Sequence, residues 1–333
     1  MQTLPVQPAS VPVGSDDPVD PAAAVEAAAL APLLAEQLGR VVRGKPEAIR
    51  LSLVALLSGG HLLLEDVPGV GKTLLAKALA RSIDGSFRRV QGTPDLLPSE
   101  LTGASVLDAS RQRWEFRPGP LFANVVLVDE VNRATPRTQS ALLEAMEERQ
   151  VTVDGITHSL PAPFFLVATQ NPFEHVGTFP LVEGQRDRFA VVVQMGHPDR
   201  ATERDLLLGH GGDDELARLG PVTDADGLAY AIRSVRSVHC EPAVAEYVVA
   251  LAEGTRSDPS VTIGASPRAS LALLHAARAA AVLAERAFVT PDDVKSVAPA
   301  VLAHRLILIG GPDLGAATAI VRRLLDSVAV PPR

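Results

Sequence analysis

The sequence predicts an α/β protein in which a parallel sheet flanked by helices precedes an all-α domain. Two short, uninterrupted apolar runs, at residues 62–64 and 125–128, are typical of strands buried on both faces of a parallel sheet. After residue 198 the strand pattern stops, and helix start signals such as Thr290-Pro291 replace it. The length of 333 residues fits about two domains.

The organisation along the chain follows from composition. Residues 1–21 contain five prolines among Ser and Asp and cannot bury an apolar face, so we expect a disordered tail. An Ala/Leu-rich helix at residues 22–38 opens the sheet domain, which is expected to span residues 22–196. The helical domain is then expected to span residues 197–333.

The first apolar strand runs into a glycine-containing turn and then into a helix at residues 74–82. Gly71, Lys72 and Thr73 complete the phosphate-binding pattern G-x-x-x-x-G-K-[ST], although Asp66 replaces its first glycine. Lys72 would reach the β- and γ-phosphates of a nucleotide, and the Thr73 hydroxyl would hold Mg²⁺. The alternative is a chance Gly-Lys-Thr at a strand-to-helix turn. The candidate phosphate-binding residues are Pro68, Gly69, Val70, Gly71, Lys72, Thr73 and Leu74.

Polar side chains follow two further strands. Asp129 and Glu130 come directly after the run 125–128, where open α/β sheets place their ligands. Phosphoryl transfer uses one carboxylate to position Mg²⁺ and another to orient the attacking water, and Asp129 and Glu130 fit these roles in that order. Asn171 follows the strand at 163–168 and can contact the γ-phosphate or the water. The alternatives are a solvated carboxylate pair and an Asn-Pro turn.

These motifs, taken together with their neighbours, resemble the MoxR family of AAA+ ATPases over about residues 35–310. The resemblance is carried by the segments 69–73, 127–134, 138–146, 168–172 and 185–189. It implies a P-loop AAA+ core with a helical lid, and an ATP- and Mg²⁺-dependent ring, expected to be hexameric. The family further implies chaperone-like remodelling or maturation of a protein client that carries a von Willebrand factor A domain.

The resemblance also implies roles for three arginines. Arg188 matches the arginine finger that acts on the nucleotide of the neighbouring subunit, with Arg186 as the reserve candidate. The alternative for either residue is a surface ion pair with Asp187 or Glu183. Arg268 lies in the first turn of a helix, where its charge opposes the helix dipole and calls for an anion.

In AAA+ proteins the segment Ser266-Pro267-Arg268 matches sensor 2, which contacts the γ-phosphate from the lid; the alternative is a partner carboxylate such as Asp258. Val42, Arg43 and Gly44 match the family segment near the adenine. The pair His304-Arg305 matches a lid motif to which we assign no role.

Two hairpins are predicted as insertions in the core. One spans residues 102–119 and matches the helix-2 insert, and the other spans 151–158, with a central Asp154-Gly155 turn, and resembles the pre-sensor 1 hairpin. In a ring both would face the axis and are candidates for client contacts. The alternative is that they decorate the edge of the core without a role.

Composition excludes several classes of protein. The net charge of −8 argues against a general nucleic-acid binder, and short basic clusters such as Arg88-Arg89 are expected to be solvated. Cys240 is the single cysteine, no apolar run reaches the ~20 residues of a membrane span, and no secretion signal is evident, so we expect no membrane insertion and a cytoplasmic location. Two alternative functions are a metal-chelatase motor subunit and a nucleotide-gated scaffold with little turnover.

Overall fold

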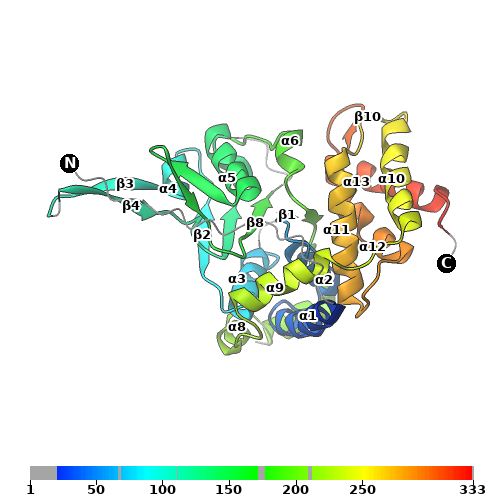
Figure 1. The fold of residues 1–333 in the computed structure, drawn as a ribbon, viewed down its shortest axis with the longest axis horizontal. Helices are drawn as coiled ribbons and strands as arrows, with labels where there is room; N and C mark the ends of the chain where they lie inside the picture. The colour runs from blue at the N-terminus through cyan, green and yellow to red at the C-terminus, as the bar shows by residue number, and fades with distance from the viewer. Residues whose placement is uncertain (1–20, 67–68, 111, 172–176, 209–211, 332–333) are drawn as a thin grey trace.

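Five parallel strands form the central sheet (Figure 1). The computed structural model describes residues 21–66, 69–110, 112–171, 177–208 and 212–331. The strand order is β2-β5-β8-β1-β9, and every neighbouring pair is parallel. The predicted parallel sheet is confirmed, with β9 as a short strand that the sequence pattern did not predict. The strands are β1 (Leu62–Glu65), β2 (Phe87–Gln91), β5 (Val125–Asp129), β8 (Phe165–Gln170) and β9 (Val191–Val193).

Helices cover both faces of this sheet, because successive strand residues point to opposite sides. Leu62 and Leu64 pack with α1 (Pro21–Val41), α2 (Pro46–Leu57) and α3 (Lys72–Ser82). Leu63, between them, packs with α4 (Pro98–Thr102) and α5 (Pro136–Glu148) on the other face. The apolar runs are uninterrupted because helices cover both faces of the sheet and keep water from each.

The helical layer of the core extends past the last strand. After α6 (Glu183–Arg186) and β9 come α7 (Arg200–Leu207), α8 (Asp213–Arg218) and α9 (Ala225–Arg236). Helices α8 and α9 pack on α1 and α3, and the Val222 amide donates to the Ser82 carbonyl at 2.8 Å. The sheet thus ends at Val193, just before the predicted boundary at residue 196, whereas packing on the core continues to about α9.

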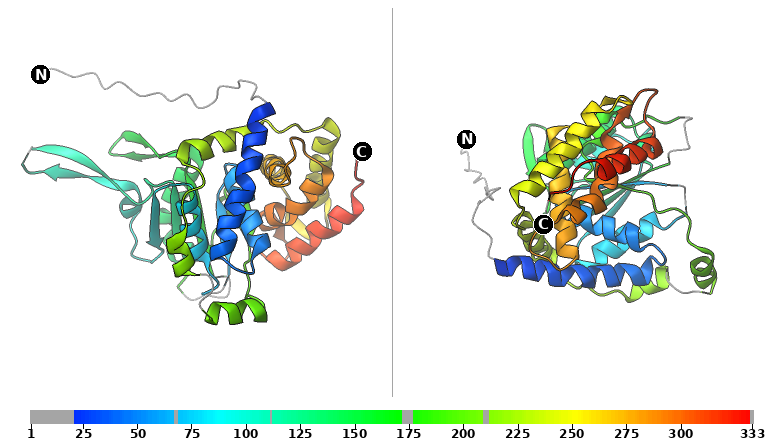
Figure 2. Two further views of the ribbon diagram at one scale, coloured as in Figure 1. Left: turned by 90° about the horizontal axis from the view of Figure 1, so that it is seen from below. Right: turned by 90° about the vertical axis from the view of Figure 1, so that its right-hand side faces the viewer.

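The remaining helices form a separate layer beside the sheet domain (Figure 2). They are α10 (Pro242–Ser257), α11 (Pro267–Leu283), α12 (Pro291–Leu302) and α13 (Leu314–Ser327). Ser266 and Thr290 cap α11 and α12 by accepting backbone hydrogen bonds, as their sequence signals predict. A two-stranded antiparallel ribbon, β10 (Val261–Ile263) with β11 (Ile307–Leu308), adds to the predicted helices.

Both predicted hairpins are present. The long one pairs β3 (Gly103–Asp108) with β4 (Arg113–Pro118), and the short one pairs β6 (Gln150–Val153) with β7 (Ile156–Ser159). Asp154 and Gly155 both have positive φ, the conformation that a tight hairpin turn requires. The long hairpin projects from the side of the sheet domain that lies away from α10–α13 (Figure 1).

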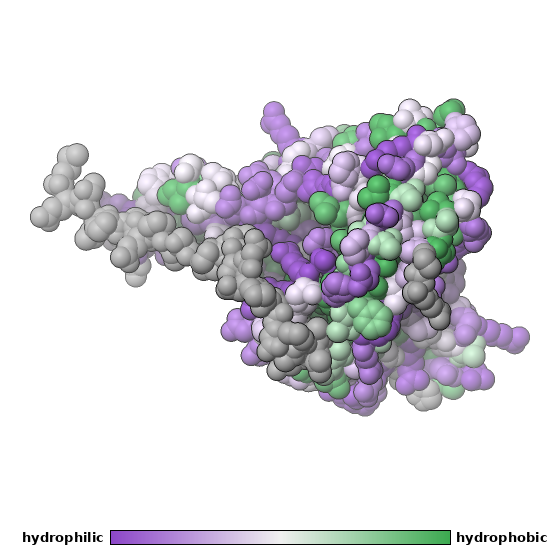
Figure 3. All heavy atoms as spheres, turned by 45° about the vertical axis from the view of Figure 1, so that its right-hand side comes forward, coloured by the Kyte–Doolittle hydropathy of each residue, from purple (hydrophilic) through white to green (hydrophobic). Residues whose placement is uncertain are grey.

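The surface is mixed in character. On the face shown in Figure 3, hydrophobic residues are interspersed among hydrophilic ones over the helical layer. Among the described residues, no helix combines the length and apolar character needed to cross a membrane. Residues 1–20 of the tail predicted at 1–21 lie outside the described residues, whereas Pro21, the first described residue, belongs to α1.

Candidate functional site

The loop between β1 and α3 has the geometry of a phosphate-binding loop. Gly69 and Gly71 have φ values of +86° and +97°, which glycine adopts without strain. Helix α3 begins at Lys72, so the amides of its first turn point out of the helix N-terminus. Val70 and Leu74 anchor the loop against the hydrophobic core, whereas Pro68 lies outside the described residues.

Asp66 stands where the phosphate-binding pattern has its first glycine, and its groups organise the loop. Its backbone carbonyl accepts a hydrogen bond from the Lys72 ammonium at 2.7 Å. Its buried carboxylate accepts a bond from the Gly196 amide, which lies just after β9. Asp66, which replaces the glycine of the pattern, therefore links the phosphate-binding loop by a hydrogen bond to the chain that follows β9.

Lys72 faces the carboxylates at the strand ends. Partial burial lowers the pKa of Lys72, while Asp66, Asp129 and Glu130 act in the opposite direction and favour its charged form. The start of α3 and the end of β5 therefore converge at one edge of the sheet. A polyphosphate bound there would add phosphate oxygens to the acceptors that this partly buried ammonium faces.

Asp129 and Glu130 occupy different environments at the end of β5. Asp129 is buried, with the Arg89 Nε at 2.6 Å from one carboxylate oxygen and the Thr169 hydroxyl at 3.3 Å from the other. Glu130 is partly exposed and has a positive φ of +55°. Its Oε2 lies 3.0 Å from both the Gln91 amide nitrogen and the Arg133 Nε.

Asn171 follows β8 directly. The Asp66 amide donates to the Gln170 carbonyl at 3.1 Å, so the end of β8 lies against the start of the phosphate loop. Asn171 is partly buried at this edge. The sheet thus brings the loop, the two carboxylates and the amide together, as the sequence pattern led us to expect.

The oxygen atoms at this edge suit Mg²⁺. The Thr73 hydroxyl and the Asp129 carboxylate are hard donors, and Mg²⁺ in nucleotide sites takes one or two protein ligands with phosphate oxygens and water. Among the described residues no group of three or more His, Cys, Asp or Glu side chains forms a separate metal cage. The donor set therefore fits a cation that a nucleotide helps to bind.

Comparisons with known proteins place this site in a family. A model of the ATPase family associated with various cellular activities (AAA) matches residues 61–191, and a model of the AAA lid domain matches residues 253–324. Chaperone MoxR1 of Mycobacterium tuberculosis is 40% identical over 306 residues, which cover 89% of this chain and 81% of the relative. The chain belongs to the MoxR family of AAA+ ATPases.

Other relatives agree with this assignment. Protein MoxR of Methylorubrum extorquens is 34% identical and covers 82% of this chain and 86% of its own length. YeaC of Bacillus subtilis, an uncharacterized protein, is 48% identical over 89% of this chain and 93% of its own. A crystal structure from Cytophaga hutchinsonii, described as a candidate ATPase, has a TM-score of 0.84 at 32% identity and covers 93% of this chain and 98% of that one. The predicted MoxR-family fold, an AAA core followed by a lid, is confirmed.

The two finger candidates of this MoxR-family chain have different surroundings. Arg186 forms a 2.9 Å ion pair with Glu65, and both side chains are largely buried. Arg188 is 30% exposed and pairs with Glu147 on α5 at 2.8 Å. Neither arginine pairs with Asp187 or Glu183 as the alternative reading proposed. Of these two arginines, Arg188 is the more exposed and can offer its guanidinium to another molecule.

Arg268 has a partner that sequence reasoning missed. It pairs with Glu147 at 2.8 Å, whereas Asp258, the alternative partner, pairs with Arg323. The helix α5 gave no signal for Glu147, because its side chain is one of several glutamates on an exposed helix face. The anion that Arg268 required is thus a carboxylate of the core.

The segment predicted near the adenine lies against the chain after β9. Val42 is buried and Arg43 is exposed. A Cβ at Gly44 would lie 2.6 Å from the Thr202 hydroxyl, so only glycine fits there. Lys45 donates to the carbonyl groups of Gly196 and His197 at 2.8 and 2.6 Å, which fixes this junction.

Two further residues at the site were not predicted as functional. Arg89 is exposed, as expected, and it also pairs with Asp129. Gln91 contacts Glu130. The position of Gln91 at the end of a strand could have indicated this contact. Strand β2 runs parallel to β5 with Gln91 opposite Asp129, so both strands end at the same edge of the sheet.

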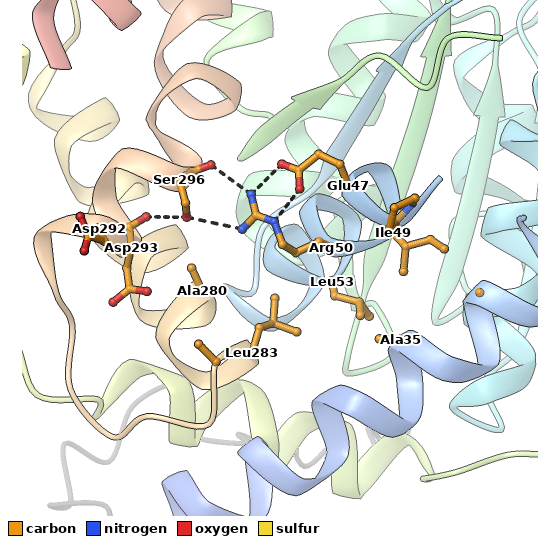
Figure 4. Close-up of a pocket in the computed structure, with 13 residues that line it drawn as sticks. Ala35, Glu47, Ile49, Arg50, Leu53, Ala280, Leu283, Asp292, Asp293 and Ser296 are labelled. Atoms are coloured by element: carbon orange, nitrogen blue, oxygen red, sulfur yellow. Dashed lines mark hydrogen bonds and ion pairs between the residues drawn. The ribbon is translucent and has the colours of Figure 1, made fainter. Parts of the chain in front are cut away.

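A hollow of about 740 Å³ lies elsewhere, between α1, α2, α11 and α12 (Figure 4). Arg50 crosses it and donates to Glu47 and to the Ser296 carbonyl. None of the predicted site residues lines this hollow. The candidate site residues therefore lie apart from this hollow, which belongs to the junction between core and lid.

Proposed function

We propose that this MoxR-family protein hydrolyses ATP with Mg²⁺ in an oligomeric ring, and that the ring uses this cycle to remodel partner proteins. The observation that carries the proposal is the convergence of Lys72, Asp129 and Glu130 at one sheet edge beside a helix N-terminus. Phosphoryl transfer needs little covalent chemistry from a protein, because positioning and charge stabilisation supply most of the rate. This edge offers both.

The roles follow from the environments. The amides of the first turn of α3 and Lys72 bind the β- and γ-phosphates, and Thr73 and Asp129 hold Mg²⁺. Glu130 is exposed enough to receive a water molecule, and its contacts with Gln91 and Arg133 aim its carboxylate. Asn171, at the end of β8, is proposed to sense the γ-phosphate.

The ring is proposed because one catalytic group faces outward. Arg188 pairs with a carboxylate of α5 and keeps part of its guanidinium exposed. A guanidinium that stabilises the transition state is worth about 10³–10⁵ in rate, so an isolated protomer would be a slow enzyme. A second copy that receives Arg188 would complete the site, and six copies are the expected number.

We propose that the client protein contacts the two hairpins, β3-β4 and β6-β7. Trp114 on β4 is 71% exposed and lies directly opposite the exposed Leu107 on β3. Ile156, beside the turn of the short hairpin, is also exposed. Large exposed apolar side chains at projecting tips suit contact with a protein, and the name of the relative Chaperone MoxR1 agrees with such a role. We propose a client with a von Willebrand factor A domain.

The test is ATP turnover per protomer, measured with Mg²⁺ as protein concentration is raised. We expect turnover to rise with concentration, because association completes the site. Arg188→Ala should abolish this rise while nucleotide binding is retained. Glu130→Gln should bind ATP and lose about 10²–10⁴ in turnover, because the water is no longer oriented by a base.

Two results would contradict the proposal. ATP binding without steady-state turnover in the wild-type protein at every concentration would favour the nucleotide-gated scaffold. Turnover that depends neither on concentration nor on Arg188 would contradict the shared site. Stimulation by a porphyrin or corrin substrate would favour the metal-chelatase motor.

A further inference from the structure

Glu147 bridges two arginines that come from different parts of the molecule. It lies in the last turn of α5, and its two carboxylate oxygens face different partners. Its Oε2 is 2.8 Å from the Arg188 Nε, which belongs to the core, and its Oε1 is 2.8 Å from the Arg268 Nη2, which belongs to the first turn of α11. One side chain therefore fixes the relative position of both guanidinium groups.

The backbone that carries Arg188 is held separately. The buried Arg305 donates to the carbonyl groups of Asp187 and Phe189 at 3.1 and 2.7 Å, on either side of Arg188. Since the backbone is anchored from the lid, the remaining freedom lies in the Arg188 side chain itself. Glu147 and the Gly184 carbonyl, which accepts from Nη1 at 2.7 Å, remove that freedom.

Both arginines keep donors for a further anion. A guanidinium carries five N–H groups in a planar fork. Within the described residues, the hydrogen bonds of Arg188 use Nε and Nη1, and those of Arg268 use Nη2. Nη2 of Arg188 and Nη1 of Arg268 are thus available to an oxyanion. The Glu147 bridge therefore orients both guanidinium groups and leaves N–H donors on each for an oxyanion.

Glu147 is the carboxylate that the two arginines share. Two guanidinium cations surround one carboxylate, and hydrogen bonds from Arg188 and then Arg268 lower the pKa of Glu147, so that it stays ionised. A hollow of about 260 Å³ opens beside Arg188, and the carboxylates Glu144, Glu147 and Glu148 line it as well.

We propose that Glu147 is a positioning residue that holds Arg188 and Arg268 as a pair, so that both reach a polyphosphate bound by a second copy of this chain. The inference rests on the proposed function, because it needs a shared site. The shared carboxylate is the reason for treating the two arginines as a unit. Glu147 itself does not touch the nucleotide.

The test uses Glu147→Gln in the full-length protein. A glutamine can accept from one arginine only, and its NH₂ group faces the other guanidinium, so the bridge opens with little change of shape. We expect kcat to fall about 10²-fold, as a misplacement of about 1 Å does, with nucleotide affinity and melting temperature unchanged. Glu147→Asp, which keeps the charge, should recover part of the loss.

Two controls make the result specific. Glu253→Gln removes an exposed carboxylate on α10, which forms no ion pair among the described residues, and should leave turnover unchanged. In an Arg188→Ala background, Glu147→Gln should have little further effect, because groups that act as a unit are not additive. Losses that multiply in the double variant would overturn the proposal.

The outcomes separate this inference from the proposed function. Wild-type kcat in Glu147→Gln, together with a large loss in Arg188→Ala, would overturn the bridge and leave the shared site intact. A lower melting temperature in Glu147→Gln without recovery in Glu147→Asp would assign Glu147 to structure and overturn its positioning role. Absence of turnover in the wild-type protein would instead remove the proposed function.

Discussion

Arg186 and Arg188 show how far two residues of the same type can differ in their surroundings. Arg186 lies in the interior against Glu65, and burial raises the pKa of that carboxyl while Arg186 opposes the rise. Arg188 lies at the surface against a carboxylate of α5. The sequence presented them as rivals for one role, and their burial suggests a stabilising role for Arg186 and a catalytic one for Arg188.

We expect Arg186→Ala to lower the free energy of unfolding by about 3–5 kcal/mol near neutral pH, because it leaves the buried Glu65 charge without its partner. The folded-state pKa of Glu65 is raised, so its contribution to stability is present at low pH and is lost as pH rises through the folded-state pKa. Loss of Arg186 raises this pKa further. The difference in free energy of unfolding between the wild-type protein and Arg186→Ala should therefore be small at about pH 4.5 and grow toward neutral pH.

Chemical denaturation of Arg186→Ala and Arg188→Ala at several pH values checks this expectation. Arg188→Ala serves as the control, since its exposed ion pair should contribute little to stability. Glu65→Gln added to Arg186→Ala should restore much of the loss, because no buried charge remains. If the loss in free energy of unfolding in Arg186→Ala did not change with pH, it would come from lost packing and not from the Glu65 charge.

The two hairpins, at the scale of elements, are joined by an aromatic contact. Phe116 of β4 stacks on His158 of β7, with ring centroids 3.8 Å apart, and Phe122 packs edge-on to Phe116. The sequence predicted each hairpin from its own alternation and turn residues. It gave no indication that they touch, because their contact joins positions about forty residues apart.

We expect His158→Ala to loosen the long hairpin. An aromatic pair is worth about 0.5–1.5 kcal/mol, so the open population of the hairpin should rise about 2- to 10-fold. Cleavage by trypsin after the exposed Arg113 follows this population and should accelerate by the same factor. Thr157→Ala, which keeps the ring stack, is the control. Equal acceleration in both variants would mean that the stack does not couple the hairpins.

The whole molecule depends on how the helical layer is attached to the core, and His304-Arg305 contributes to this attachment. His304 and Arg305 form a short 3₁₀ turn, 303–305, after α12, and both are buried. Arg305 pairs with Asp187 at 2.7 Å and His304 contacts the Phe189 carbonyl at 3.1 Å. The motif without an assigned role therefore joins the lid to the loop that carries Arg188.

We expect Arg305→Lys to lower both stability and turnover. Lysine keeps the charge but cannot reproduce the fork of hydrogen bonds, so buried carbonyl groups lose partners at a cost of about 1–3 kcal/mol. Calorimetry should show a lower melting temperature, and kcat at saturating ATP should fall because Arg188 is less well placed. Arg323→Lys alters an ion pair within the lid and should leave kcat unchanged. A lower melting temperature with unchanged kcat would mean that the hydrogen bonds of Arg305 stabilise the protein but do not place Arg188 for catalysis.

The sequence by itself determined the local features of this protein: the buried strands, the glycine turn before α3, the capped helices α11 and α12, and the hairpin turn at Asp154-Gly155. These depend on residues close together in the chain, whose backbone preferences and burial pattern act locally. Only the tertiary structure decided the partners of charged groups, such as Asp66 with Gly196, Arg89 with Asp129, and Glu147 with both Arg188 and Arg268. A charge pairs with whatever opposite charge the fold brings within a few ångströms, and sequence distance carries no record of that.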